Sequence, residues 1–313
     1  MYDLLMRKII LLGLILSVFS LTGCAFSDPR ITGTPETSAF DDVFSANATA
    51  SAIELQSAWA AVAGLAKLNP DQEKWSTIAD TLHGLWVVVT GPDPVNRIPA
   101  MTQDIGEAST FVDDKAALTE VEAAVTLAYE AHLVRAKTSQ GLEALLWGSI
   151  AASLAQINQG LTGAYGAPIL ANSAVTVTIT DEDSALSDLI VSYDEAVFAL
   201  RTSLGFLSSS RVTQVAKIAT TWEREMESLL AIAAEREVIP ETTAIYSLPP
   251  GRDDKAGMAL LASSQQSIVE SAATWVACAE DPSVGVDILV SAATITSAQG
   301  IGIAQWPGFP DGS

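Results

Sequence analysis

Four acidic and histidine side chains have the types and spacing of a metal site between helices. A di-metal site in a four-helix bundle takes one Glu from each of two helices and a Glu-x-x-His pair from each of the others, because residues i and i+3 share a helix face. Asp80 and His83 form one such acid-x-x-His pair. Glu54 and Glu130 fall on the helices expected before and after it. Together these residues could hold iron or manganese in a partial site.

This site would be incomplete, because the helix expected over 140–163 has no ligand in its central residues 149–153. The second of the two histidines, His132, lies two residues after Glu130, a spacing at which helical side chains do not face each other. We therefore favour the interpretation that all these groups, His132 included, are solvated surface residues. On that interpretation no cofactor is expected, and a non-catalytic role is favoured over an enzymatic one.

Cys24 has the clearest chemical assignment in the chain. It ends the run Leu21-Thr22-Gly23-Cys24, which follows an apolar stretch over 9–20 and the basic pair Arg7 and Lys8. An apolar stretch of this length suits a secretory signal peptide, whereas a membrane-spanning helix needs about 20 residues.

The run 21–24 resembles the lipobox of bacterial lipoproteins. That resemblance implies a signal peptide over 1–23 and lipidation of the Cys24 thiol, with palmitate among the acyl chains. We expect residues 24–39 to form a short tether. The protein would then be anchored by lipid to the cell membrane at its extracytoplasmic face.

The charge of the chain excludes one class of partner. Sixteen basic and 37 acidic residues leave a formal net charge of −21, which repels nucleic acid and anionic lipid surfaces. Attachment to a membrane must therefore come from the lipid at Cys24. Beyond Cys24 the one remaining cysteine is Cys278, so neither a disulfide nor a cysteine-based zinc site is expected in the mature protein.

The pattern beyond the tether predicts an all-α protein. Apolar residues recur every three or four positions, as they do between Leu142 and Leu161. Asp71, Asp113, Asp181 and Asp253 are expected to cap helix N-termini, where a carboxylate accepts free amide hydrogens. The β-branched stretch at 175–180 is expected to be part of a linker. The eight expected helices span residues 41–69, 71–90, 114–138, 140–163, 181–209, 211–237, 254–280 and 284–304.

Short matches at one offset indicate an internal duplication. Residues 113–118, Asp-Asp-Lys-Ala-Ala-Leu, recur 140 positions later at 253–258 as Asp-Asp-Lys-Ala-Gly-Met. Residues 159–161, Gln-Gly-Leu, recur at the same offset as Gln-Gly-Ile. We expect two related four-helix units, unit one over 40–168 and unit two over 180–310.

Unit two also resembles a ferritin-like domain family of unassigned function from actinobacterial envelope proteins. The resemblance rests on residues 194–199 in its first helix, 244–249 before its third helix and 306–310 at its end. It implies a ferritin-like four-helix bundle and no established activity. Together with the duplication, it leads us to expect two tandem ferritin-like bundles.

Two alternatives stay open for the tail and for the function. Residues 306–310, Trp-Pro-Gly-Phe-Pro, could dock into a partner protein of the envelope, or fold back and seal the bundle. The favoured function is a non-catalytic binding or scaffolding role of an envelope-anchored lipoprotein. The alternative is a metal-binding ferritin-like protein, such as a metal-dependent oxidoreductase, with its partial site in unit one.

Overall fold

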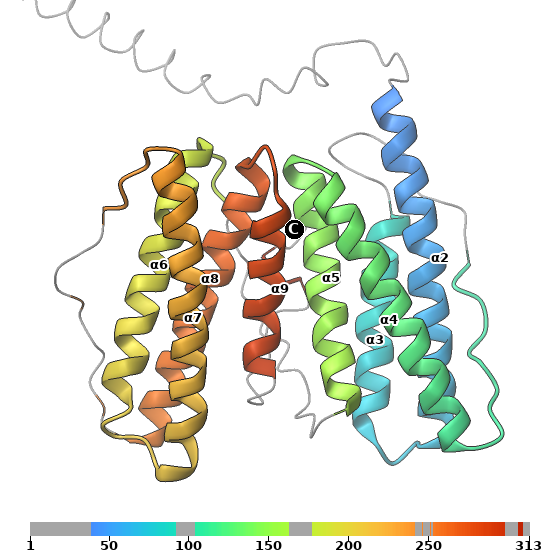
Figure 1. Ribbon diagram of the computed structural model, residues 1–313. Coiled ribbons are helices and arrows are strands. Elements are labelled where there is room, and N and C mark those ends of the chain that lie inside the picture. The colour runs from blue at the N-terminus through green and yellow to red at the C-terminus, as the bar shows by residue number, and fades with distance from the viewer. Residues whose placement is uncertain are drawn as a thin grey trace, which may run out of the picture.

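The protein is built from α-helices. The computed structural model describes residues 39–91, 104–162, 177–241, 246, 251, 253–297 and 306–308. Within these ranges eight helices form and no strand is present, so the expected all-α class is confirmed. Figure 1 shows the helices side by side, with most of their axes close to one common line of direction and the chain passing up and down between them. They are α2 (Ala39–Leu68), α3 (Glu73–Thr90), α4 (Asp114–Thr138), α5 (Gly141–Thr162), α6 (Glu182–Ser203), α7 (Ser209–Glu235), α8 (Asp254–Cys278) and α9 (Ser283–Ser297).

Most helix ends lie within a few residues of those expected from the sequence. The exception is α6, which stops at Ser203 because residues 204–208 form a turn. Helix α9 is described as far as Ser297, and the rest of its expected range lies outside the described residues. Residues 177–180 have no regular secondary structure, in agreement with the expected linker. The signal peptide, Cys24 and nearly all of the tether lie outside the described residues.

Three of the four expected aspartate caps form. The carboxylates of Asp113, Asp181 and Asp253 accept the backbone N–H of the residue three positions later, at 2.8, 2.9 and 2.9 Å. The expected cap at Asp71 is wrong. Gln72 occupies the cap position of α3, where its side chain accepts no backbone N–H of the helix, and Asp71 lies one residue earlier, in the turn after α2.

The first four helices and the last four pack in the same order. In the first set α2 contacts α3 and α4, and α4 contacts α5; in the second set α6 contacts α7 and α8, and α8 contacts α9. The turn after the first helix makes the same contact in both sets. Asn69 donates to the carboxylate of Asp114 at 2.9 Å, and the backbone N–H of Ser208 donates to Asp254, which is 140 residues after Asp114.

These turn contacts show in which direction each helix runs relative to its neighbours. Because α4 begins beside the α2–α3 turn, α3 and α4 run in the same direction, and the chain must return along the whole molecule between them. Residues 104–111 of this return lie against α2, where Ser109 donates to the backbone oxygen of Ala60 at 2.9 Å. The close approach requires Gly64, since a Cβ there would stand 2.5 Å from the Ser109 oxygen. One long crossover between two helical hairpins is typical of ferritin-like bundles.

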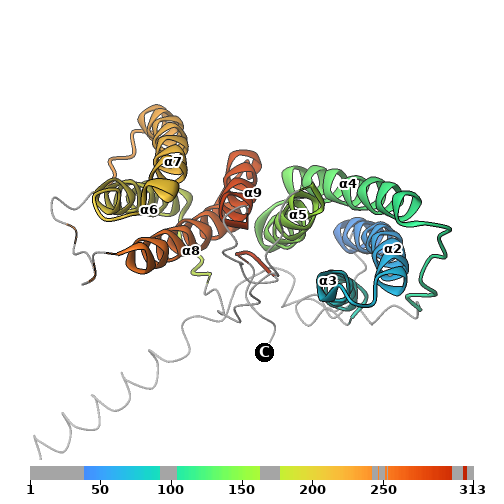
Figure 2. The same cartoon turned by 90° about the horizontal axis from the view of Figure 1, so that it is seen from below.

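The two sets meet through a pseudo-two-fold arrangement. Helix α5 packs on α9, while the α5–α8 and α4–α9 contacts correspond to each other when the sets are exchanged. Viewed from below, α5 and α9 lie in the middle, and the pairs α2–α3 and α6–α7 lie on the outer sides (Figure 2). Gln140 donates to the backbone oxygen of Glu280 at 3.3 Å, and these residues are 140 positions apart. A residue that contacts its own equivalent lies next to such an axis.

One continuous core runs through both sets of helices. Every residue from 147 to 157 of α5 is buried, because α4 covers one side of the helix and α8 and α9 cover the other. This explains the absence of ligand-type residues at its centre. Trp306 is also buried, and Gly308 packs against Ala273 of α8 and Leu289 of α9. Residues 306–308 therefore fold back onto their own helices.

Candidate functional site

His132 lies at the centre of a buried polar network between α2 and α4. The side chain has no exposed surface, so the expectation of a surface histidine is wrong. The Nδ1 atom lies 2.7 Å from the backbone oxygen of Ala128, which can only accept, so Nδ1 carries the proton. The Nε2 atom therefore accepts a hydrogen bond from the Ser51 hydroxyl at 2.6 Å. Both ring nitrogens are satisfied in the neutral imidazole.

The Ser51–His132 pair has the connectivity of a nucleophile and its base, but not the environment. Ser51 has no exposed surface, so a substrate cannot reach its oxygen. The pKa of His132 is lowered to about 3, chiefly by burial; the hydrogen bond to Ala128 opposes this shift and the nearby Arg135 guanidinium adds to it. An imidazole that resists a proton this strongly is a poor general base at neutral pH. The pair therefore joins two helices and does not form a catalytic centre.

A bidentate ion pair lies beside this hydrogen bond. The two Nη atoms of Arg135 on α4 donate to the two carboxylate oxygens of Glu54 on α2, both at 2.6 Å. Their side chains are 12% and 19% exposed, so the pair is mostly withdrawn from water. The same Glu54 carboxylate lies 3.6 Å from Nδ1 of His132. Charge-assisted bidentate contacts of this kind fix both distance and orientation between helices.

The structure does not bring the residues of the candidate metal site together. Glu54 faces α4 and binds Arg135, whereas Asp80, His83 and Glu130 are exposed on α3 and α4. The ring of His83 stacks on Trp86 of its own helix, with centroids 6.1 Å apart. Among the residues that the structure describes, no group of three or more acidic, histidine or cysteine side chains could hold a metal ion. Packing rotates α3 so that its apolar face meets α2, which leaves Asp80 and His83 on the outside.

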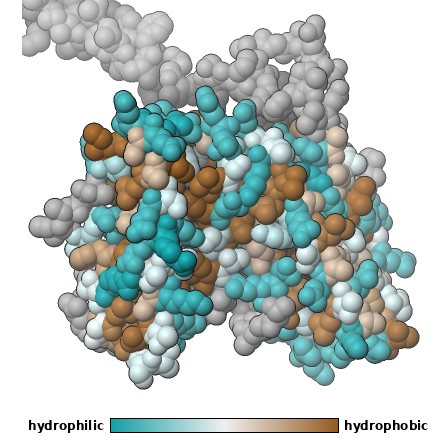
Figure 3. Space-filling view, in the orientation of Figure 1, coloured by the Kyte–Doolittle hydropathy of each residue, from teal (hydrophilic) through white to brown (hydrophobic). Residues whose placement is uncertain are grey.

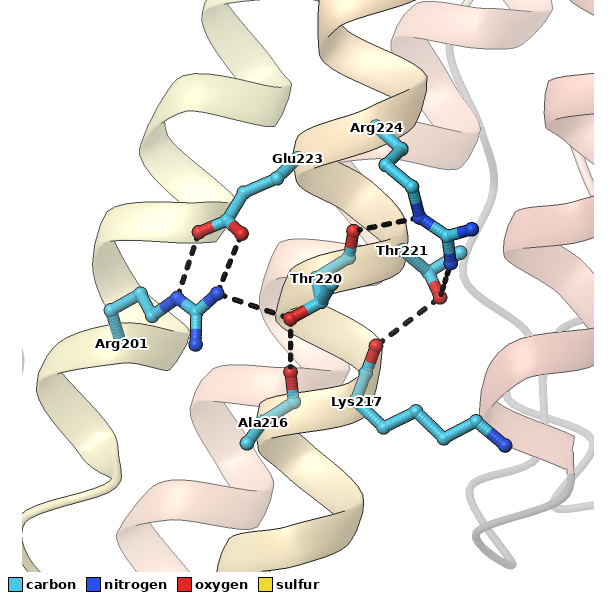
Figure 4. A network of polar contacts seen from close by, with 7 residues as sticks. All are labelled: Arg201, Ala216, Lys217, Thr220, Thr221, Glu223 and Arg224. Carbon is cyan, nitrogen blue, oxygen red and sulfur yellow. Dashed lines mark hydrogen bonds and ion pairs between the residues drawn. The ribbon is translucent and has the colours of Figure 1, made fainter.

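Unit two contains hydrogen bonds to one carboxylate between its helices and ion pairs on its surface. Glu225 of α7 accepts hydrogen bonds from Tyr193 of α6 at 2.8 Å and from Ser291 of α9 at 2.6 Å. On the surface, Arg201 of α6 binds Glu223 of α7 through two nitrogens and also reaches Thr220, whereas Lys217 extends away from it (Figure 4). The Arg201–Glu223 pair therefore connects α6 to α7 from the outside.

A polar cleft lies where the two sets of helices meet. Its volume is about 420 Å³. The α4–α5 turn forms one wall and the α8–α9 turn the other, at the end of the molecule where α2 begins (Figure 1). The cleft is lined by Asn47, Lys137, Thr138, Ser139, Gln140, Glu143, Glu280, Asp281 and Pro282.

The charged groups of the cleft are held by neighbouring residues. One carboxylate oxygen of Glu143 accepts hydrogen bonds from Asn47, Ser139 and Trp147, at 3.3, 3.1 and 3.0 Å. Lys137 is paired with Asp287 of α9 at 2.6 Å. Hydrogen bonds from the Ser283 hydroxyl and from its backbone N–H lower the pKa of Asp281, with a smaller contribution from Lys137.

The cleft adjoins the buried network through one aromatic side chain. The ring of Trp147 lies 6.0 Å from the ring of His132, and its Nε1 donates to Glu143. Phe44 of α2 also stacks on Trp147, with the two ring centroids 5.9 Å apart. The wall of the cleft in unit one is thus connected through Trp147 to the buried contact between Ser51 and His132.

The surface carries separate apolar side chains in addition to the cleft. Leu127 and Val134, which share a face of α4, are each 62% exposed. Figure 3 shows hydrophobic patches interrupted by hydrophilic residues on the face formed by α4, α7 and α9. No helix in the described parts of the chain is both long enough and apolar enough to span a membrane.

Comparison with protein-family models, with curated proteins and with solved structures finds no match to this chain. The lipobox and the ferritin-like resemblance therefore stay predictions that rest on the residues quoted above.

The sequence patterns missed the residues that form the buried network. Ser51 and His132 are 81 positions apart, as are Glu54 and Arg135, so no local spacing connects them. A signal was nevertheless present in α4, where His132 and Arg135 lie at i and i+3 and so share a helix face. The buried neighbours Ala128 and Ala136 show that this face points inward.

Proposed function

We propose that this protein is a lipoprotein of the cell envelope with a non-catalytic binding or scaffolding role. The anchor is the lipid on Cys24, and the body consists of two tandem ferritin-like four-helix bundles derived from one duplicated unit. The matched helix order, the matched Asp114 and Asp254 contacts and the long crossovers support this organisation.

The cleft between the two sets of helices is the observation that carries the binding role. It has polar walls from both units, and carboxylates of Glu143, Glu280 and Asp281 line it. Such walls suit a polar partner from the envelope that presents hydrogen-bond donors or positive charge. Because the cleft belongs to neither unit alone, a duplicated body would gain a site that a single bundle does not have.

Anchoring is tested by replacing Cys24 with Ala. We expect the wild-type protein to incorporate palmitate and to sediment with membranes. The Cys24→Ala variant should lose the label and leave the membrane fraction, since the helical body would have no other attachment. A variant that sediments as before would contradict the lipoprotein assignment.

The binding role is tested by reversing charge at the cleft. Chemical cross-linking in intact cells should yield the same envelope partner with the wild-type protein and with Glu227→Lys, whose site is exposed on α7. A Glu280→Lys, Asp281→Lys double variant should lose this partner while it keeps its helical circular dichroism. Equal capture by all three proteins would contradict the role of the cleft.

A further inference from the structure

At the position of His132, unit one buries a titratable side chain, whereas the equivalent position of unit two has none. Helices α4 and α8 align with an offset of 140, as their aspartate caps show, so the equivalents of His132 and Arg135 are Ala272 and Trp275. Both equivalents are buried. Unit two joins α6 to α8 with hydroxyl groups, and Ser192 and Ser271 lie 2.7 Å apart. The fold therefore does not require an ionisable group at this position.

The contacts of His132 hold only while the ring is neutral. A proton on Nε2 would turn the acceptor of the Ser51 hydrogen bond into a donor and would place a charge where no water reaches. Ser51 could rotate to accept, but its own hydrogen would then lose this partner. Proton uptake therefore weakens the contact between α2 and α4.

The charged groups around the ring would not compensate for this proton. On α2, Glu54 already pairs with Arg135, so a charged imidazole would leave one carboxylate to balance two cations. On α5, the ring of Trp147 lies next to the imidazole, and Glu143 is on the far side of Trp147, whose Nε1 donates to it. On α9, Asp287 is the charged group that packs near α4, and it is paired with Lys137.

We propose that protonation of His132 weakens the contact between α2 and α4, so that the open state of unit one gains population in mild acid while unit two does not respond. A protein at the outer face of a membrane meets the pH of its surroundings, and the opening would expose the interior of unit one next to the cleft. The device goes beyond the proposed binding role and does not depend on it.

The direction of the pH effect follows from linkage. Burial keeps the pKa of His132 near 3 in the closed protein, whereas an exposed histidine titrates near 6.5. The open state therefore binds more protons between these values, and closure weakens as the pH falls below about 6.5. For one proton the open-to-closed ratio should rise about tenfold between pH 7.5 and 5.5. This pH interval lies above the range in which ordinary carboxylates titrate.

Hydrogen exchange of the full mature chain tests this proposal. After correction for the intrinsic exchange rate, amide protection around Ser51 and His132 should fall about tenfold between pH 7.5 and 5.5. Protection in α6 and α8 should change less than twofold. An equal fall in both units, or none in α2 and α4, would overturn the proposal.

Two variants assign the effect to one side chain. His83→Gln removes the exposed histidine and should leave the pH dependence intact. His132→Gln can still accept from Ser51 and should make α2–α4 protection independent of pH over this range. If His132→Gln does not fold, NMR of the wild-type ring decides, because an imidazole that takes up a proton near pH 6.5 in the closed protein would overturn the proposal.

Discussion

Of the two histidines, His83 is exposed, as the favoured interpretation of the sequence has it, whereas His132 is buried against that expectation. His83 completes an acid-x-x-His pair, yet it is exposed and stacks on Trp86. His132 shows no ligand spacing, yet it is fully buried with both nitrogens bonded. Spacing identifies side chains that share a helix face, but it does not show which face meets a neighbouring helix. At the residue scale, chemistry follows from partners that are distant in the sequence.

The two bidentate ion pairs give a matched prediction at this scale. Glu54→Ala should destabilise the protein by about 2–3 kcal/mol, because it leaves the mostly buried Arg135 without its counter-charge. Glu223→Ala should cost at most about 1 kcal/mol, because Arg201 and Glu223 are 41% and 33% exposed and water replaces the pair. Chemical denaturation of both variants checks the difference, and equal losses would show that the pair between α2 and α4 has no special role.

At the scale of single helices, local sequence determines a great deal. The 3.6-residue periodicity and the aspartate caps place most helices within a few residues of their observed bounds. The caps succeed at Asp113, Asp181 and Asp253, where the accepting carboxylate and the donating backbone N–H lie within one turn. They fail at Asp71 because a cap needs one particular residue at the boundary, and boundaries shift by one or two residues in a turn.

The caps can be compared within one protein. Asp113→Ala and Asp253→Ala should each reduce the free energy of unfolding by about 1 kcal/mol, since each removes an acceptor for a free helical N–H. Asp71→Ala should change it by less than about 0.5 kcal/mol, because this side chain caps no helix in the structure. Thermal unfolding of the three variants measures these values, and a large effect at Asp71 would place the start of α3 one residue earlier.

At the scale of the whole molecule, the contact between α5 and α9 unites the two sets of helices. Gly148 lies in this contact, and a Cβ there would stand 3.5 Å from Leu289 and 3.7 Å from Val286, an ordinary packing distance. The duplication at an offset of 140 predicts that two units exist, but it does not predict how they meet. The run 147–157 of α5, buried all round, is explained only by this contact.

Substitutions of Gly148 test this packing. Gly148→Ala should leave stability unchanged or raise it by up to about 1 kcal/mol, because Ala favours the helix and its methyl group fits. Gly148→Leu should lower it by about 1–3 kcal/mol or more, because the longer side chain meets α9. Denaturant titration of both variants distinguishes them, and a harmless Gly148→Leu would mean that α5 and α9 are not tightly packed.

The sequence by itself determined the all-α class and most ends of the eight helices in the described ranges, because those depend on periodicity and on contacts within one turn. It also placed Cys24 in a lipobox-like run, which stays a prediction. Only the tertiary structure decided that Ser51 meets His132, that Glu54 meets Arg135 and that a polar cleft forms between two turns. The physical reason is that helix rotation and helix pairing depend on how apolar faces fill space together, and no single segment contains that information.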